Sequence, residues 1–115
     1  MRRERFYLED MDVAAQAVSE FLHGYTFEGF RVNRLLQSAI VHQLTVIGEA
    51  AANLSAELRA RHREIPWADI TGLRNIVVHN YFGIDWEEVW STAVEDVPVL
   101  QGQIVAILRE EFEKQ

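Results

Sequence analysis

The chain contains no cysteine among its 115 residues, which excludes disulfide scaffolds, thiolate zinc sites, iron–sulfur clusters and cysteine nucleophiles. Long apolar runs are also missing, since the longest uncharged stretch near the middle covers only 35–48 and contains several polar side chains. Such a stretch is too short and too polar to cross a bilayer. Acidic residues follow the basic start before any apolar run begins, which does not suit a secretory signal. We therefore expect a cytoplasmic protein without a membrane segment.

Common phosphate and metal motifs are absent as well. The sequence has neither a Gly-x4-Gly-Lys loop nor a Gly-x-Gly-x-x-Gly turn, and it has no serine-nucleophile elbow. Its four histidines lie far apart, without a His-x3-His pair. We expect neither a metal ion nor an organic cofactor.

Lysine is scarce: one lysine accompanies ten arginines, and the acids outnumber both to give a net charge of −7. Because indiscriminate nucleic-acid binding needs many cations, this charge argues against a broad basic face. Most of the acidic excess lies in 82–115, whereas 54–80 has a small positive balance. Since a guanidinium suits bidentate contacts to phosphate or carboxylate, a small local anion site is expected.

Helical periodicity dominates what is present. With 49% hydrophobic and 25% charged residues, the composition is that of one soluble globular domain covering 1–115. Apolar side chains that recur every three or four residues predict helices and no strand. The predicted helices cover 3–23, 33–53, 56–62 and 66–80, and a last helix begins at 85. The fourth of these is expected to be interrupted at Gly72 and to fray near 80–83. We expect an all-α bundle of four to five helices.

Individual residues refine this prediction. Asn33, Ser55 and Asp85 suit helix N-caps, and Pro98 is expected to kink the last helix near 94–96. Gly48 and the alanines after it leave room for the close approach of another helix. The connector 25–32 is expected to pack its aromatic rings, and the tryptophans are expected in the core or an interface. The stripe of the first helix is predicted to comprise Tyr7, Met11, Ala14, Val18 and Phe21.

One segment, 73–83, concentrates polar groups that suit catalysis. Arg74, His79 and Tyr81 supply a permanent cation, a proton carrier for neutral pH and a phenol. On an ideal helix Asn75 and His79 share a face, whereas Arg74 and His79 differ by about 140°. A long arginine side chain, a loosened helix or two copies of the segment across a dimer axis could bring them together, and we favour the dimer. A purely structural role for the histidine stays open.

These few groups would be enough to cleave RNA, because the 2′-hydroxyl of RNA is itself the nucleophile. The enzyme then needs only proton transfer and stabilisation of charge at phosphorus. His79 would take the proton of the 2′-hydroxyl or protonate the leaving oxygen, while Arg74 would hold the phosphate. No metal ion would be required.

Other candidate residues carry two interpretations each. Glu49 lies among small and apolar residues, where it could orient Arg74 or His79, or instead form a buried or interface salt bridge. The basic cluster of the third helix could guide a phosphate backbone or could be an ordinary solvated face. Its arginines are Arg59, Arg61 and Arg63.

Several strings, taken in order, resemble the HepT-like members of the HEPN superfamily. The decisive element is Arg-x4-His-x-Tyr, formed here by Arg74, His79 and Tyr81, with Asn75 directly after the arginine. The flanking strings are Ile47-Gly48-Glu49-Ala50-Ala51, Ile65-Pro66-Trp67, Gly72-Leu73, Phe82-Gly83, Asp85 and Val89-Trp90. The resemblance covers nearly the whole chain.

The resemblance implies a HEPN-type bundle that dimerises through its motif-bearing helices, with two copies of the motif in one cleft. It further implies a metal-independent endoribonuclease that acts as the toxin of a type VII-like toxin–antitoxin pair. The antitoxin would be a minimal nucleotidyltransferase that transfers AMP to Tyr81, silences the toxin and can join it in a higher assembly. An alternative is a non-catalytic HEPN dimer that binds nucleotide or the nucleotidyltransferase.

Overall fold

The computed structural model describes residues 3–76 and 83–113, and within these ranges the ordered elements are all helical. In chain order they are α1 (Glu4–Leu22), α2 (Phe27–Arg31), α3 (Arg34–Ala52), α4 (Ala56–Arg61), α5 (Trp67–Gly72), the 3₁₀ turn η1 (Leu73–Asn75), α6 (Trp86–Ser91), the π turn η3 (Thr92–Asp96) and α7 (Val97–Phe112). The all-α bundle predicted from the periodicity is confirmed.

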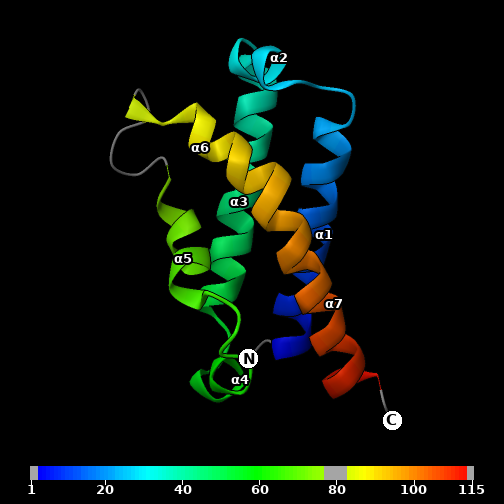
Figure 1. Cartoon of the computed structure of the whole chain (residues 1–115). Coiled ribbons are helices and arrows are strands. Elements are labelled where there is room, and N and C mark those ends of the chain that lie inside the picture. The colour runs from blue at the N-terminus through cyan, green and yellow to red at the C-terminus, as the bar shows by residue number, and fades with distance from the viewer. Residues whose placement is uncertain (1–2, 77–82, 114–115) are drawn as a thin grey trace.

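Three long helices form the framework of the bundle (Figure 1). α1 packs along α3, and α7 packs against α1. α5 and η1 pack against α3, and α2 lies at one end of the bundle, where it contacts both α3 and α6. α6, η3 and α7 follow one another as a single long rod that crosses the bundle. This arrangement leaves the end of η1 and the start of α6 near the same side of α3.

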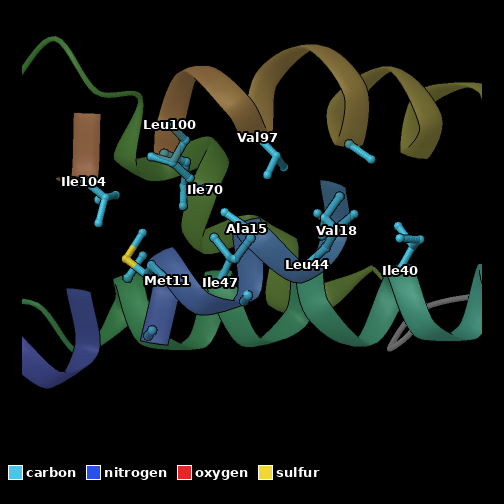
Figure 2. Close-up of a cluster of buried hydrophobic side chains, with 14 of the residues drawn as sticks. Met11, Ala15, Val18, Ile40, Leu44, Ile47, Ile70, Val97, Leu100 and Ile104 are labelled. Carbon is cyan, nitrogen blue, oxygen red and sulfur yellow. The ribbon is translucent and has the colours of Figure 1, made fainter. Parts of the chain in front are cut away.

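The core lies between α1, α3 and α7 and extends to α5 (Figure 2). Side chains from α7 point toward those of α1 and α3, and all of the labelled ones are buried. The predicted stripe of the second long helix is buried throughout; it comprises Leu36, Ile40, Leu44, Ile47, Ala51 and Leu54. In α1 the buried face differs from the predicted stripe at its C-terminal end. Phe21 is 39% exposed, and Leu22 is the residue that packs into the core. The inclusion of Phe21 was therefore wrong, because the buried face continues the series Leu8, Met11, Ala15, Val18.

Polar side chains fix the starts of four helices. Thr26, Asn33, Ser55 and Asp85 each accept a hydrogen bond from the backbone N–H three residues further on, at 3.0–3.2 Å. Each bond satisfies an amide that has no partner inside the helix, which is worth about 1 kcal/mol. The three caps predicted from the sequence are confirmed, and Thr26 is an additional one that begins α2.

The connector 25–32 contains the short helix α2 and packs its rings, as predicted. Phe30 is fully buried, and its ring centroid lies 5.9 Å from that of Trp86 and 5.5 Å from that of Trp90. Phe27 adds an edge-to-face contact with Trp90 at 6.1 Å. These aromatic pairs hold α6 against α2.

The predicted kink before Pro98 takes the form of the π turn η3. The N–H of Val97 donates to the carbonyl oxygen of Thr92, five residues earlier, in place of the usual four. Proline lacks an N–H and its ring collides with the carbonyl four residues before it, so a widened turn just N-terminal to Pro98 accommodates both effects.

The helix predicted over 66–80 is shorter than expected. α5 ends at Gly72, and the chain tightens into the 3₁₀ turn η1 before Ile76. Glycine is a poor helix former, and the turn brings the backbone directly against α3, as described below. The interruption predicted at Gly72 is therefore confirmed, and it takes the form of a change from α-helix to 3₁₀ turn.

Candidate functional site

Arg74 occupies the middle of η1, where its backbone touches α3. A Cβ added at Gly48 would lie 2.5 Å from the backbone N of Arg74 and 3.0 Å from the carbonyl oxygen of Ile70. Only glycine permits this approach, because the neighbours are backbone atoms that cannot rotate away. The expectation that another helix approaches closely at Gly48 is confirmed, and the consequence is a firmly positioned Arg74 backbone.

The side chain of Arg74, by contrast, is open to solvent. Its Nη1 lies 3.7 Å from Oε2 of Glu49, and the two side chains are 44% and 63% exposed. An ion pair so long and so exposed contributes little to stability. Glu49 is therefore exposed in the single chain, so its pair with Arg74 is not a buried salt bridge, whereas an interface salt bridge stays a prediction. The pairing leaves the guanidinium accessible to an anionic ligand.

A groove of about 350 Å³ adjoins η1 on the side of α6. Its described lining combines apolar side chains with an amide, two carboxylates and a hydroxyl, and it includes no lysine, arginine or histidine. The residues come from α3, η1, the approach to α6, α6 itself and η3. They are Leu44, Leu73, Asn75, Ile76, Gly83, Ile84, Asp85, Glu88, Val89 and Thr92.

Two of the predicted site residues, His79 and Tyr81, lie outside the described residues. Their predicted relation to Arg74, and the three explanations considered above, therefore stay predictions. In the described part the α-helix ends at Gly72, and Arg74 sits in the 3₁₀ turn η1. Asn75 lies in the groove lining, one residue after Arg74.

The arginines of the basic cluster lie elsewhere. α4 is at the opposite end of α5 from η1 (Figure 1), so Arg59, Arg61 and Arg63 do not gather around Arg74. Arg61 donates to Glu111 of α7 at 2.7 Å, and His62 contacts the same carboxylate. This clamp ties α4 to the last turn of α7.

The clamp changes the acid–base properties of its members. The hydrogen bond from Arg61 is the main influence that lowers the pKa of Glu111 below its ordinary value; His62 acts in the same direction and partial burial opposes both. The same hydrogen bond raises the pKa of Arg61. The lowered pKa of Glu111 therefore results from a structural contact between α4 and α7.

Sequence reasoning missed the groove and the clamp. The partners Arg61 and Glu111 are 50 residues apart, so no local pattern links them. It also missed Gln37, the buried side chain of α3 whose amide donates to the carbonyl oxygens of Phe30 and Arg31 at 3.1 and 2.8 Å. A glutamine within the apolar series of α3 was the one available signal for this contact.

Two further observations concern the described residues alone. In 3–76 and 83–113 no three histidine, aspartate or glutamate side chains gather in a way that could hold a metal ion. No helix in these same ranges is both long enough and apolar enough to cross a membrane.

Comparison with known proteins gives a consistent set of relatives. The family described as "Ribonuclease HepT-like" matches residues 11–107. "Putative RNase TTE0752" of Caldanaerobacter subterraneus subsp. tengcongensis is 36% identical over 96% of this chain and 99% of its own length. "Probable ribonuclease HepT" of Thermococcus cleftensis is 36% identical over 89% of this chain and 93% of its own, and "Putative RNase MJ1380" of Methanocaldococcus jannaschii is 33% identical over 90% and 94%. No solved structure gives a significant match.

Proposed function

The chain belongs to the HepT-like ribonuclease family, and from this premise we propose that it is a metal-independent endoribonuclease in which Arg74 and His79 are the catalytic residues. The observation that carries the proposal is the placement of Arg74. Its backbone is held against Gly48 while its guanidinium stays 44% exposed. A backbone held in place with a guanidinium open to solvent suits a phosphate-binding residue.

In the proposed reaction the 2′-hydroxyl of the substrate attacks the adjacent phosphorus. His79 accepts the hydroxyl proton, the bond from phosphorus to the 5′-oxygen breaks, and the leaving oxygen takes its proton from the protonated imidazole of His79, in the same or the partner protomer, or from water. The products are a 2′,3′-cyclic phosphate and a 5′-hydroxyl. Arg74 stabilises the charge that builds up on the phosphoryl oxygens. Glu49, 3.7 Å from Arg74, and Asn75, in the adjoining groove, have supporting roles.

The biological role we propose is that of a toxin paired with a minimal nucleotidyltransferase. Transfer of AMP to Tyr81 would add negative charge two residues from His79, where the substrate phosphate must bind, and would repel the substrate. The active form is proposed to be a homodimer, with the motifs of both protomers in one cleft.

The direct test is cleavage of end-labelled transfer RNA and messenger RNA by the purified protein in excess chelator. We expect cyclic-phosphate ends from the wild type and a loss of at least about 100-fold for Arg74→Ala and His79→Ala. Arg109→Ala and His23→Ala are matched controls at exposed positions, and circular dichroism monitors the fold. Unchanged cleavage by Arg74→Ala would refute its catalytic role, and a folded wild type that binds the nucleotidyltransferase without cutting RNA would favour the binding module.

Mixing the two inactive variants tests the composite cleft. If Arg74 of one protomer works with His79 of the other, heterodimers of Arg74→Ala and His79→Ala contain one intact pair and regain activity. If both residues act within one protomer, no intact pair exists in the mixture and cleavage stays absent.

A further inference from the structure

The groove beside η1 has features of a nucleobase site. Its volume of about 350 Å³ lies within the range of small-ligand pockets. Leu44, Ile76, Ile84 and Val89 give it apolar walls, and the polar groups Asn75, Glu88 and Thr92 are set among them. Apolar walls with a few polar groups suit a flat heteroaromatic ring, which gains from burial and still needs hydrogen bonds at its edge.

Charge decides which part of a nucleotide the groove can accept. Asp85 and Glu88 contribute two carboxylates, and no cationic side chain occurs among the described lining residues. These two carboxylates disfavour a phosphate beside them, whereas a neutral base meets no such repulsion. Arg74 directly precedes the groove residue Asn75 in the chain and has an exposed guanidinium, which could bind the phosphate of the same nucleotide. Asn75 and Arg74 would thus bind different parts of one nucleotide, the base and the phosphate.

The hydrogen-bonding groups favour one base. Asp85 uses Oδ1 to cap α6, whereas no hydrogen bond or ion pair within the described residues occupies the carboxylate of Glu88. A carboxylate accepts two parallel hydrogen bonds, and guanine alone presents two adjacent donors, N1–H and N2–H₂, on its Watson–Crick edge. Adenine and cytosine place an acceptor next to their amino group, which a carboxylate repels, and uracil places its one N–H between two carbonyls.

We propose that this groove is a guanine-binding subsite, in which Glu88 accepts from N1–H and N2–H₂ of a base in the RNA substrate. The proposal deepens the ribonuclease function above and rests on it for the identity of the polymer. Asn75, which also lines the groove, would offer its amide N–H₂ to the O6 of the same base. Thr92 lies where the π turn opens, and π turns of this kind recur at functional sites.

Binding of single nucleotides tests the subsite without requiring catalysis. Titration of ¹⁵N-labelled protein with guanosine 3′-monophosphate is expected to shift the amide signals of the groove residues Ile84, Glu88, Val89 and Thr92. Inosine 3′-monophosphate lacks only the N2 amino group and is expected to bind about tenfold more weakly. The 3′-monophosphates of adenosine, cytidine and uridine should bind no better than inosine.

Two variants separate the groove carboxylate from general acidity. Glu88→Gln replaces one acceptor oxygen with a donor and is expected to abolish the roughly tenfold preference for guanosine over inosine. Glu87→Gln removes an equal charge from the neighbouring exposed residue, which does not line the groove, and should preserve the preference. Equal affinities for all nucleotides in the wild type, or signals that move only on α4, would overturn the proposal, as would tighter binding of the adenosine nucleotide.

Cleavage assays then distinguish this inference from the proposed function. RNA cleavage with no guanine preference and no effect of Glu88→Gln would leave the ribonuclease in place and refute the subsite. Selective binding of the guanosine nucleotide in the groove by a protein that cuts no RNA would support the subsite and refute the ribonuclease.

Discussion

Replacing Gly48 with alanine tests the contact that positions Arg74. The added Cβ would lie 2.5 Å from the backbone N of Arg74, 3.0 Å from the oxygen of Ile70 and 3.1 Å from the carbonyl carbon of Leu73. Since non-bonded atoms rest about 3.5 Å apart, η1 must recede from α3 by about 1 Å. Overpacking of this kind costs about 1–3 kcal/mol, and the better helix propensity of alanine returns at most about 1 kcal/mol.

We therefore expect Gly48→Ala to lower the free energy of unfolding by about 1–2 kcal/mol and the Tm by about 4–8 °C. If Arg74 is catalytic as proposed, the effect on RNA cleavage should be larger, up to about 100-fold, because a displacement of about 1 Å would misplace its guanidinium. Urea unfolding followed by far-UV circular dichroism measures the first quantity, and the rate of RNA cleavage by folded protein measures the second.

Gly102→Ala is the matched control for this substitution. Gly102 also lies inside a helix, α7, but no atom outside its own helical backbone and chain neighbours lies within 4 Å of an added Cβ. This variant is expected to gain about 0.5–1 kcal/mol from helix propensity alone and to keep full activity. If Gly48→Ala gained as much stability as Gly102→Ala, the close approach of η1 to α3 would be refuted.

Three further predictions concern other contacts. Tyr81→Phe should retain RNA cleavage but escape silencing by the nucleotidyltransferase with ATP; a variant that is still silenced, or still gains one AMP by mass spectrometry, would contradict the role of Tyr81. Because the pKa of Glu111 is lowered in the folded protein, its contribution to stability is present above the unfolded pKa and lost as pH falls through the folded value. Acid unfolding curves of Glu111→Gln should therefore lose part of their pH dependence on the acidic side, and those of Glu110→Gln should keep it. Gln37→Leu should destabilise the fold by about 1–3 kcal/mol in urea, since the carbonyl oxygens of Phe30 and Arg31 lose the side-chain amide as a donor, although Phe30 also accepts from the N–H of Asn33; an unchanged midpoint would show that water replaces the amide.

The features predicted correctly from the sequence depend on neighbours in the chain. Asn33, Ser55 and Asp85 cap helices because each accepts a hydrogen bond from the amide three residues further on. So short a pattern can be recognised from the sequence alone. The π turn before Pro98 has the same local origin. The long apolar stripes of α3 and α7 follow from periodicity, because one face of each helix must be buried.

The features that escaped prediction depend on packing between distant segments. Gly48 was identified as a place of close approach, but only the fold shows that the approaching backbone is that of Arg74. The pairing of Arg61 with Glu111 spans 50 residues. From the sequence alone, each of these charged residues would be assigned to the solvated face of its own helix. The groove draws its walls from α3, η1, α6 and η3, so neither its existence nor the place of Glu88 in it could be read from any one helix.

The π turn η3 also sets the rotation of α7 about its axis relative to α6. A π turn holds one residue more than an α turn within the same helix. In this chain a single-residue deletion in 92–96 would rotate α7 by about 100° relative to α6 and turn its apolar stripe away from α1. The extra residue therefore keeps the buried stripe of α7 facing the core.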